Sequence, residues 1–200
     1  MTPEDFWLEE RASFREGYRL ICGVDEAGCG PLAGPVYAAA VILPEGWTHP
    51  YLNDSKKVTE RRRELLFDTI TASALAYGIA SADEKEIDAL NILRARLLAM
   101  RRAVEALSPA ADFALVDGNR APGLSVPCRT LVGGDGRSAS IAAASILAKV
   151  SRDRFMAEMA LRYPQYRFEK HKGYPTKLHY ELLREYGPSP IHRLTFLKNL

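Results

Sequence analysis

The chain has 200 residues, of which 47% are hydrophobic and 26% are charged, and its formal net charge is +2. This length and composition predict one main domain with a well-buried core. They exclude a protein that crosses the membrane by helices, because no run approaches the ~18 apolar residues that a span needs.

The first residues are typical of a helix start and not of a targeting signal. Thr2, Pro3, Glu4 and Asp5 combine a cap, a first-turn proline and acids that face the positive helix end. A secretion signal would instead be basic and then apolar. We therefore expect a helical extension over residues 1–18 and a cytoplasmic protein.

Five segments are predicted strands, because each is apolar or β-branched and is bounded by Gly, Pro or Asp. They cover residues 20–24, 36–43, 77–81, 113–116 and 126–132. The turn between the first two strands is too short for a crossover helix, so these two should pair antiparallel. The later strands alternate with helices and should add in parallel. The order of elements predicts an α/β fold with a mixed sheet.

Helical patterns occupy the segments between and after the strands. Thr59 can cap a helix that extends to about residue 73, and Ser81 with Glu84 can form a capping box before the next. The apolar residues of that second helix recur at helical spacing and should lie in the core: Leu93, Leu97, Met100, Val104 and Leu107. A long helix follows residue 135. The last extends from about residue 176 to 186, where Gly187 and Pro188 end it.

The net charge is divided unevenly along the chain. Residues 1–135 carry 15 Lys and Arg against 20 Asp and Glu, whereas residues 136–200 carry 12 against 5. The basic part could face a polyanion, or it could be an ordinary solvated helical surface.

Four acids stand where regular structure is predicted to end. Asp25 and Glu26 close the first strand, Asp117 closes the fourth, and Asp135 lies in a glycine-rich turn before the long helix. Carboxylates at the strand ends of an α/β sheet occupy the usual crevice for ligands. An isolated Asp-Gly is often only a turn, and Asp135 could simply cap a helix. The adjacent charges of Asp25 and Glu26 fit such a structural role worst, because beside a buried strand they need compensation.

The chemistry of these acids favours a hard metal ion. Carboxylate oxygens without nearby His or Cys suit Mg²⁺ or Mn²⁺, and the three cysteines show no C-x-x-C spacing that would indicate zinc. Several carboxylates at one place are typical of a two-ion site for phosphoryl transfer. Nearby, Gly28 and Gly30 flank Cys29 and could let the backbone approach a ligand closely. The spacing of these glycines does not fit a dinucleotide-binding loop.

Six blocks of sequence together resemble the bacterial ribonuclease HII family. They are DEAGCGPLAGPV from Asp25, NDSKK from Asn53, VDGN from Val116, GGDGRSASIAAASILAKVSRD from Gly133, HKGYPTKLH from His171 and GPSPIHRLTF from Gly187. They occur in order from about residue 19 to 197, which is nearly the whole chain.

The resemblance implies a ribonuclease H-like fold with a mixed five-stranded sheet flanked by helices and a C-terminal helical segment. Residues 19–200 would form the type-2 ribonuclease H catalytic domain. The implied enzyme is an endonuclease that cuts RNA in RNA–DNA hybrids and incises at single ribonucleotides embedded in duplex DNA. It would leave a 3′-hydroxyl and a 5′-phosphate, act without a membrane, and be a monomer.

The resemblance also implies roles for individual residues. Asp25, Glu26, Asp117 and Asp135 would be the catalytic acids that bind two Mn²⁺ or Mg²⁺ ions. We expect Asp25 to be shared by both ions, Glu26 and Asp117 to hold one, and Asp135 to complete the other.

The remaining implied roles concern the substrate. The backbone of Gly28-Cys29-Gly30 would sense the ribose 2′-hydroxyl, and Tyr174 would stack on the following sugar. Other predicted contacts lie along the nucleic-acid groove: Ser55, Lys56, Ser138 and Lys172.

Position 29 departs from the family, which usually has a basic residue there. If the main chain recognises the ribose, only a phosphate contact is lost with Cys29; if the side chain contributes, binding should weaken. No motif supplies a general base that would make Cys29 a nucleophile.

On the long helix, Ser138, Ser145, Lys149 and Arg152 recur at helical spacing and should form a polar line, with Arg152 on a solvated face and Asp153 pairing locally. The histidines near the C-terminus are expected to be structural or to contact phosphate.

Two alternatives remain open from the sequence. One is a ribonuclease HIII-like nuclease with the same chemistry, and the other is a hybrid-binding protein that does not cleave. The four acids argue against a pure binder, because a carboxylate cluster repels phosphate.

Overall fold

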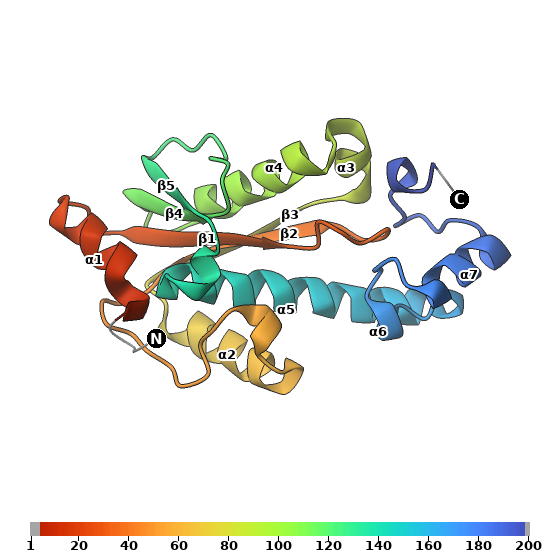
Figure 1. Ribbon diagram of the computed structural model, residues 1–200, viewed down its shortest axis with the longest axis horizontal. Helices are drawn as coiled ribbons and strands as arrows, with labels where there is room; N and C mark the ends of the chain where they lie inside the picture. Colours follow the sequence, from red (N-terminus) through yellow and green to blue (C-terminus); the bar gives the residue numbers. More distant parts are fainter. Residues whose placement is uncertain (1–4, 199–200) are drawn as a thin grey trace.

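The computed structural model describes residues 5–198 and contains one five-stranded sheet (Figure 1). The strand order is β3-β2-β1-β4-β5. The strands are β1 (Ile21–Ala27), β2 (Val36–Ile42), β3 (Ala76–Ala82), β4 (Phe113–Asp117) and β5 (Cys128–Leu131). The predicted helix start at Thr2, Pro3 and Glu4 lies outside the described residues.

The sheet is mixed, as predicted. Strand β2 pairs antiparallel with both β1 and β3, whereas β4 is parallel to β1 and to β5. The expectation that every later strand adds in parallel is wrong for β3. Only a loop and α2 separate β2 from β3, and β3 returns along the free edge of β2 in the opposite direction.

Helices cover both faces of the sheet (Figure 1). On one face lies α4 (Ile92–Glu105), preceded by α3 (Glu84–Leu90), and on the other lies α5 (Ala139–Arg162), with α2 (Glu60–Ser73) packed on its outer side. Small residues allow this close approach. A Cβ on Gly23 of β1 would lie 2.0 Å from the backbone of Ser140, so the β1–α5 contact requires glycine at this position.

The two ends of the chain add helical segments at opposite ends of the sheet (Figure 1). At the N-terminal end are η1 (Asp5–Trp7) and α1 (Leu8–Arg15). At the other end, beyond α5, are η4 (Pro164–Tyr166), α6 (Phe168–His171), α7 (Lys177–Tyr186) and η5 (Leu194–Phe196). A separate apolar cluster that includes Leu32, Met156 and Phe168 joins this C-terminal segment to the loop after β1.

Three predictions about helix ends and faces need correction. The capping box before α3 is formed by Asp83 and Glu86, not by Ser81 and Glu84, because β3 continues to Ala82. Thr59 occupies the N-cap position of α2, but its side chain makes no capping hydrogen bond.

The third correction concerns the buried stripe. The predicted single helix is interrupted at Asn91, whose φ of 70° ends α3, and the side chain of Asn91 then caps α4. Within α4, the face that packs on the sheet is centred on alanines and not on the leucines. Leu93 is 42% exposed and Leu97 only partly buried, whereas Ala95 and Ala99 are buried beside Met100 and Val104.

Candidate active site

The sheet brings the carboxylates of two strands to one place. Because β1 and β4 are parallel and Val24 pairs with Val116, Asp25 and Asp117 occupy the next positions on neighbouring strands. Asp117 is the last residue of β4, as predicted, and Asp25 lies two residues before the end of β1, which continues to Ala27. Asp25 is 5% exposed.

Asp135 reaches the same place through a tight turn. It lies in η3 (Gly134–Gly136), and the backbone N–H of Gly134 donates to Asp117 Oδ1 over 2.7 Å. A Cβ on Gly134 would lie 2.6 Å from Ile141 and 3.3 Å from Asp117 Oδ1, so this approach excludes a side chain at position 134. The alternative that Asp135 simply caps the long helix is wrong, because Ser138 caps α5.

The four acids form an undercompensated negative cluster. Burial, and then the charges of Glu26, Asp117 and Asp135, raise the pKa of Asp25 well above its usual value. The pKa of Asp135 is also raised, by burial and by Asp54 and Asp117. The fold therefore places carboxylates where their negative charges repel one another, and a bound cation would reduce this repulsion.

Nearby cationic side chains neutralise these carboxylates only in part. Arg96 of α4 is 3.0 Å from Glu26 Oε1, and Lys56 is 3.8 Å from Asp135 Oδ2, although 82% of the Lys56 side chain is exposed. The other oxygen of Glu26 is buried and has no hydrogen-bond partner. A buried oxygen without a partner, within an acidic cluster, fits a divalent metal ion that oxygen ligands would hold.

The side chains are not yet arranged as metal ligands. Within residues 5–198, no three acidic, histidine or cysteine side chains form a ready-made metal site. The Glu26 carboxylate faces Arg96 and the thiol of Cys29, and Asp117 accepts from the Gly134 backbone. Coordination would require these carboxylates to exchange such contacts for metal.

The glycine loop that follows β1 lies beside this cluster. Gly28 has a φ of 101°, and a Cβ there would lie 2.3 Å from Arg152 Nε, so both backbone shape and space require glycine. The thiol of Cys29 donates to Glu26 Oε1 over 3.4 Å. Burial, and then Glu26, raise the pKa of Cys29 to about 12, so the nucleophilic thiolate is absent at neutral pH.

An arginine that we did not single out from the sequence holds this loop. Arg193 is fully buried, and its guanidinium donates to three carbonyl oxygens: Gly28 over 2.6 Å, Cys29 over 3.0 Å and Gly34 over 2.9 Å. The only signal in the sequence is a charged residue between the apolar residues Ile191 and Leu194, beside His192. Such a signal does not say which distant loop the arginine binds.

Tyr174 lies next to the same loop. A Cβ on Gly30 would be 3.9 Å from the Tyr174 ring, and 41% of this tyrosine is exposed. Arg152 lies over the ring, 5.6 Å from its centroid. Lys172, two residues earlier, has a φ of 48° and extends its ammonium to within 4.0 Å of Glu60. Gly30 and Tyr174 therefore form one surface beside the carboxylates.

Most of the predicted polar line along α5 is buried, with Lys149 partly exposed, and the solvated face expected at Arg152 is not observed. Ser138 donates to Glu10 of α1, and Ser145 donates to Ser55, so these three hydroxyl groups are engaged inside the protein. Arg152 is fully buried and donates to the carbonyl of Lys172. Of the four predicted groove contacts, the structure exposes Lys56 and part of Lys172, whereas both serines are buried.

Asp153 pairs locally, as expected: its Oδ1 lies 2.6 Å from Lys149 Nζ, one helical turn away. The histidines of the C-terminal segment are buried and hydrogen-bonded to one another and to backbone, which makes a structural role the observed one.

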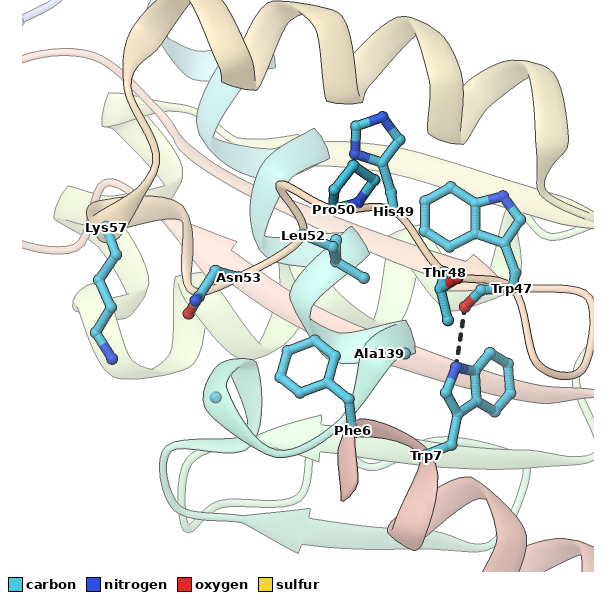
Figure 2. Close-up of a pocket in the computed structure, with 11 residues that line it drawn as sticks. Phe6, Trp7, Trp47, Thr48, His49, Pro50, Leu52, Asn53, Lys57 and Ala139 are labelled. Atoms are coloured by element: carbon cyan, nitrogen blue, oxygen red, sulfur yellow. Dashed lines mark hydrogen bonds between the residues drawn. The ribbon is translucent and has the colours of Figure 1, made fainter. Parts of the chain in front are cut away.

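A cavity with a different lining lies beside this site. It measures about 610 Å³ and is enclosed by η1, the loop from Trp47 to Asn53 and the start of α5 (Figure 2). Phe6, Trp7 and Leu52 project into it, and Trp7 donates to the carbonyl oxygen of Trp47 over 2.9 Å. Among the described residues, those that line the cavity include none of the four acids. It is therefore separate from the carboxylate cluster.

Comparison with known proteins identifies the family. The sequence model of "Ribonuclease HII" matches residues 22–199. The chain belongs to the ribonuclease HII family. It is 53% identical over 197 residues to the ribonuclease HII of Caldicellulosiruptor saccharolyticus, covering 98% of this chain and 96% of that protein. It is 55% identical over 188 residues to that of Endomicrobium trichonymphae, covering 94% of this chain and 90% of that protein.

Solved structures agree with this assignment. The ribonuclease H2 of Pyrococcus horikoshii OT3 superposes with a TM-score of 0.74 at 27% identity, over 88% of this chain and 93% of that one. Bst-RNase HIII in complex with Mn²⁺ has a TM-score of 0.64 at 17% identity, over 84% of this chain and 63% of that one, and shares the fold. The predicted ribonuclease H-like fold is confirmed, and family membership makes the chain a metal-dependent ribonuclease H, an endonuclease that acts on RNA–DNA hybrids. None of the described helices is long and apolar enough to cross a membrane.

Proposed function

We propose that this ribonuclease H incises at single ribonucleotides embedded in duplex DNA as well as within longer RNA–DNA hybrids, leaving a 3′-hydroxyl and a 5′-phosphate. The observation that carries the proposal is the placement of the undercompensated carboxylates beside the glycine loop and Tyr174. Acids that can hold cations then adjoin a backbone surface that can meet one sugar, which is the arrangement that cutting at a single ribose requires.

We propose that Asp25, Glu26, Asp117 and Asp135 hold two Mg²⁺ or Mn²⁺ ions, with Asp25 shared between them. The raised pKa of Asp25 and the unpartnered oxygen of Glu26 support this. When bound, such ions supply Lewis-acid activation of a water and charge neutralisation at the phosphate. The structure of Bst-RNase HIII with Mn²⁺ is of the same fold and is consistent with this choice of metal.

The residues of the chain have distinct proposed tasks around these ions. The backbone of Gly28, Cys29 and Gly30 meets the 2′-hydroxyl, which is both a donor and an acceptor and distinguishes RNA from DNA at one position. Tyr174 stacks on the sugar that follows, and Lys56 and Lys172 contact phosphates. Ser55 and Ser138 support this surface from within the protein, since their hydroxyls are buried.

The proposed state of the enzyme is a cytoplasmic monomer. Size-exclusion chromatography with light scattering tests the monomer, and a stable dimer at micromolar concentration would contradict it.

A cleavage assay tests the proposed activity. The substrate is a duplex with one ribonucleotide, compared with an all-DNA duplex of the same sequence and a continuous RNA–DNA hybrid, each with Mg²⁺, with Mn²⁺ or with chelator. We expect metal-dependent cutting at the ribonucleotide and no cutting of all-DNA. A chain that bound the ribonucleotide duplex but never cut it would be the non-cleaving binder, and cutting confined to the continuous hybrid would exclude single-ribonucleotide incision.

A further inference from the structure

We propose that the adjacent residues His192 and Arg193 are positioning residues for ribose recognition, fixing the glycine loop and Tyr174 relative to each other. The inference rests on the proposed function, because it concerns the two surfaces that we assign to the ribonucleotide and the sugar after it. Neither residue touches the carboxylates in the contacts described above. Each acts through a different part of the recognition surface.

Arg193 fixes the shape of the glycine loop. Its three donors go to carbonyl oxygens of residues 28, 29 and 34, so one planar group sets the orientation of several successive peptides. No acidic partner of Arg193 occurs within residues 5–198; its guanidinium lies instead 5.2 Å from the ring centroid of Phe196. Because this buried guanidinium donates to three backbone carbonyl oxygens of one loop, we infer that it stabilises the conformation of that loop.

The backbone around Arg193 ties the same loop to the C-terminal segment. The Arg193 N–H donates to the Leu32 carbonyl over 2.9 Å, and the Gly34 N–H donates to the Ile191 carbonyl over 2.8 Å. His192 and Ala33 form an antiparallel bridge. The Leu32 N–H donates to the carbonyl of Gly173, next to Tyr174, over 2.8 Å. The loop is thus hydrogen-bonded both to residues 191–193 and to the turn that carries Tyr174.

His192 fixes Tyr174 through a second histidine. His179 Nδ1 lies 3.0 Å from the Tyr174 carbonyl oxygen, which can only accept, so this nitrogen carries the proton. His179 Nε2 must then accept, and its partner at 3.0 Å, His192 Nε2, must donate. His192 Nδ1 in turn accepts from the N–H and hydroxyl of Ser189, at 2.8 and 2.7 Å.

Every nitrogen of this pair of rings therefore has one consistent role. The chain of hydrogen bonds has a single direction, from Ser189 through His192 and His179 to the Tyr174 carbonyl. Both histidines are at most 2% exposed, so water cannot replace a lost partner without opening the segment. Since His192 and Arg193 are consecutive, a shift of their backbone moves the glycine loop and the Tyr174 turn together.

The first experiment isolates Arg193. In an Asp25→Asn background, which prevents cutting, affinities are measured for a duplex with one ribonucleotide and for the all-DNA duplex. We expect Arg193→Lys to reduce the preference for the ribonucleotide roughly tenfold or more, because a point charge cannot hold three carbonyls, while affinity for all-DNA stays within about twofold. Equal losses for both duplexes would overturn the role of Arg193.

The second experiment tests whether His179 and His192 act through Tyr174. Cleavage of the single-ribonucleotide duplex and of the continuous hybrid is compared for His179→Gln, His192→Gln, Tyr174→Ala and the double variants. We expect each histidine variant to lower kcat/KM on the single-ribonucleotide duplex roughly 10-fold more than on the hybrid, and to add little once Tyr174 is Ala. If the loss of kcat/KM in a double variant equalled the product of the two single losses, the histidines would not act through Tyr174.

Two controls keep these outcomes separate from misfolding and from failure of the proposed function. His49→Gln alters the one histidine outside the C-terminal segment and should leave both substrate ratios unchanged. Thermal unfolding verifies that each variant is folded. If Arg193→Lys is not folded, the comparison of single and double histidine variants tests the inference by itself. A wild-type enzyme that never cuts at single ribonucleotides would overturn the proposed function itself, whereas normal cutting with unchanged substrate ratios in the variants would overturn only this inference.

Discussion

The charge of Asp25 is the residue-scale feature that most directly links folding to chemistry. This carboxylate is buried among Glu26, Asp117 and Asp135, and its pKa is raised for that reason. The charged form therefore costs stability at neutral pH in the absence of metal, and that cost is compensated only when cations are bound. A residue that weakens the fold to serve the site is typical of active sites.

Asp25→Asn should separate these two effects. The variant keeps the shape of the side chain but removes one of the repelling charges, so we expect it to lose most cleavage while its Tm at pH 7 in chelator rises by several degrees. For a chain of this size, ~1 kcal/mol corresponds to about 2–4 °C. Calorimetry with and without Mn²⁺ provides the measurement, and wild type should gain more from the metal than the variant. Near-normal cutting by Asp25→Asn at saturating metal would contradict the two-ion assignment.

Cys29 is the residue at which this chain departs from its family. Its carbonyl is held by Arg193, whereas its thiol faces Glu26. A change of side chain should therefore leave the loop backbone in place. Because phosphate contacts set affinity and backbone contacts read the sugar, we expect Cys29→Arg to tighten binding without moving the cut.

The measurement for Cys29→Arg is a salt titration of binding, together with mapping of the cut and Cys29→Ser as the matched control. One more neutralised phosphate should steepen the log–log salt dependence by up to about one unit. An unchanged slope would mean that the arginine pairs with Glu26 and not with phosphate. A relocated cut would mean that the side chain at position 29 itself reads the sugar.

At the scale of elements, the sequence predicts the strands better than it predicts the faces and ends of helices. The strands are recognisable because runs such as that from Val36 to Ile42 are apolar over their whole length and end at loop residues. The exposure of Leu93 could not be predicted in this way. The buried face of α4 is centred on Ala95, Ala99 and Ala103, and alanines give a weaker hydrophobic pattern than the leucines on which the prediction relied.

The residues of the candidate site also differ in how well the sequence predicts their roles. Its acids are predictable because Asp25 and Asp117 stand at the ends of recognisable strands. The role of Arg193 is not predictable, because it binds a loop about 160 residues earlier in the chain. The burial of Ser138 likewise depends on a helix at the other end of the sequence, whose Glu10 accepts its hydroxyl.

The start of α5 offers a prediction about Ser138 that differs from a role in substrate contact. Its hydroxyl accepts from the N–H of Ile141 and donates to Glu10, which also accepts from the N–H of Ser140. Ser138→Ala should lower the free energy of unfolding by about 1–2 kcal/mol, because a cap is lost and a buried carboxylate loses a donor. Urea unfolding and steady-state kinetics check this. A normal stability with a raised KM would instead indicate direct contact with substrate.

The C-terminal segment should be sensitive to acid. Burial, reinforced by neighbouring histidines, lowers the pKa of both His179 and His192 to about 4, from about 6.5 in the unfolded chain. As the pH falls from 6.5 to 4, the unfolded chain binds protons that the folded pair does not, so stability falls over this window and is constant above it. Since one pKa unit is worth about 1.4 kcal/mol, one such histidine accounts for about 3 kcal/mol at pH 4.

Chemical unfolding at pH 7, 5.5 and 4.5 measures this dependence. The other titratable groups packed against the pair are His171 and Tyr166. We expect His179→Gln to be less stable than wild type at pH 7 but to lose less on acidification, whereas His49→Gln should follow the wild type throughout. Parallel pH curves for wild type and His179→Gln would show that the histidine pair does not titrate in this range.

At the scale of the whole molecule, the uneven division of charge becomes a spatial one. The acids of the site come mainly from the sheet, whereas the basic C-terminal part, with formal charge +7 over residues 136–200, includes the turn that carries Lys172 and Tyr174. A polyanion bound at the site would meet η2 (Ser55–Lys57), where Lys56 lies 3.8 Å from Asp135, and this turn, where Lys172 lies 4.0 Å from Glu60. The acidic cluster itself can accept phosphate only when cations are present.

Lys56 and Lys172 should therefore report on a single substrate that reaches both elements. Each lysine that neutralises a phosphate contributes about 0.9 units to the magnitude of the log–log salt slope of binding. Lys56→Gln and Lys172→Gln should therefore each lower this magnitude by about one unit, and the double variant by about two. The two lysines share no ion-pair partner, since Lys56 faces Asp135 and Lys172 faces Glu60, so their effects should add. Binding is measured in the Asp25→Asn background, and Lys85→Gln on α3 is the control that should leave the slope unchanged. If only one of the two variants changed the slope, the duplex would contact only the element that carries that lysine and would not reach both.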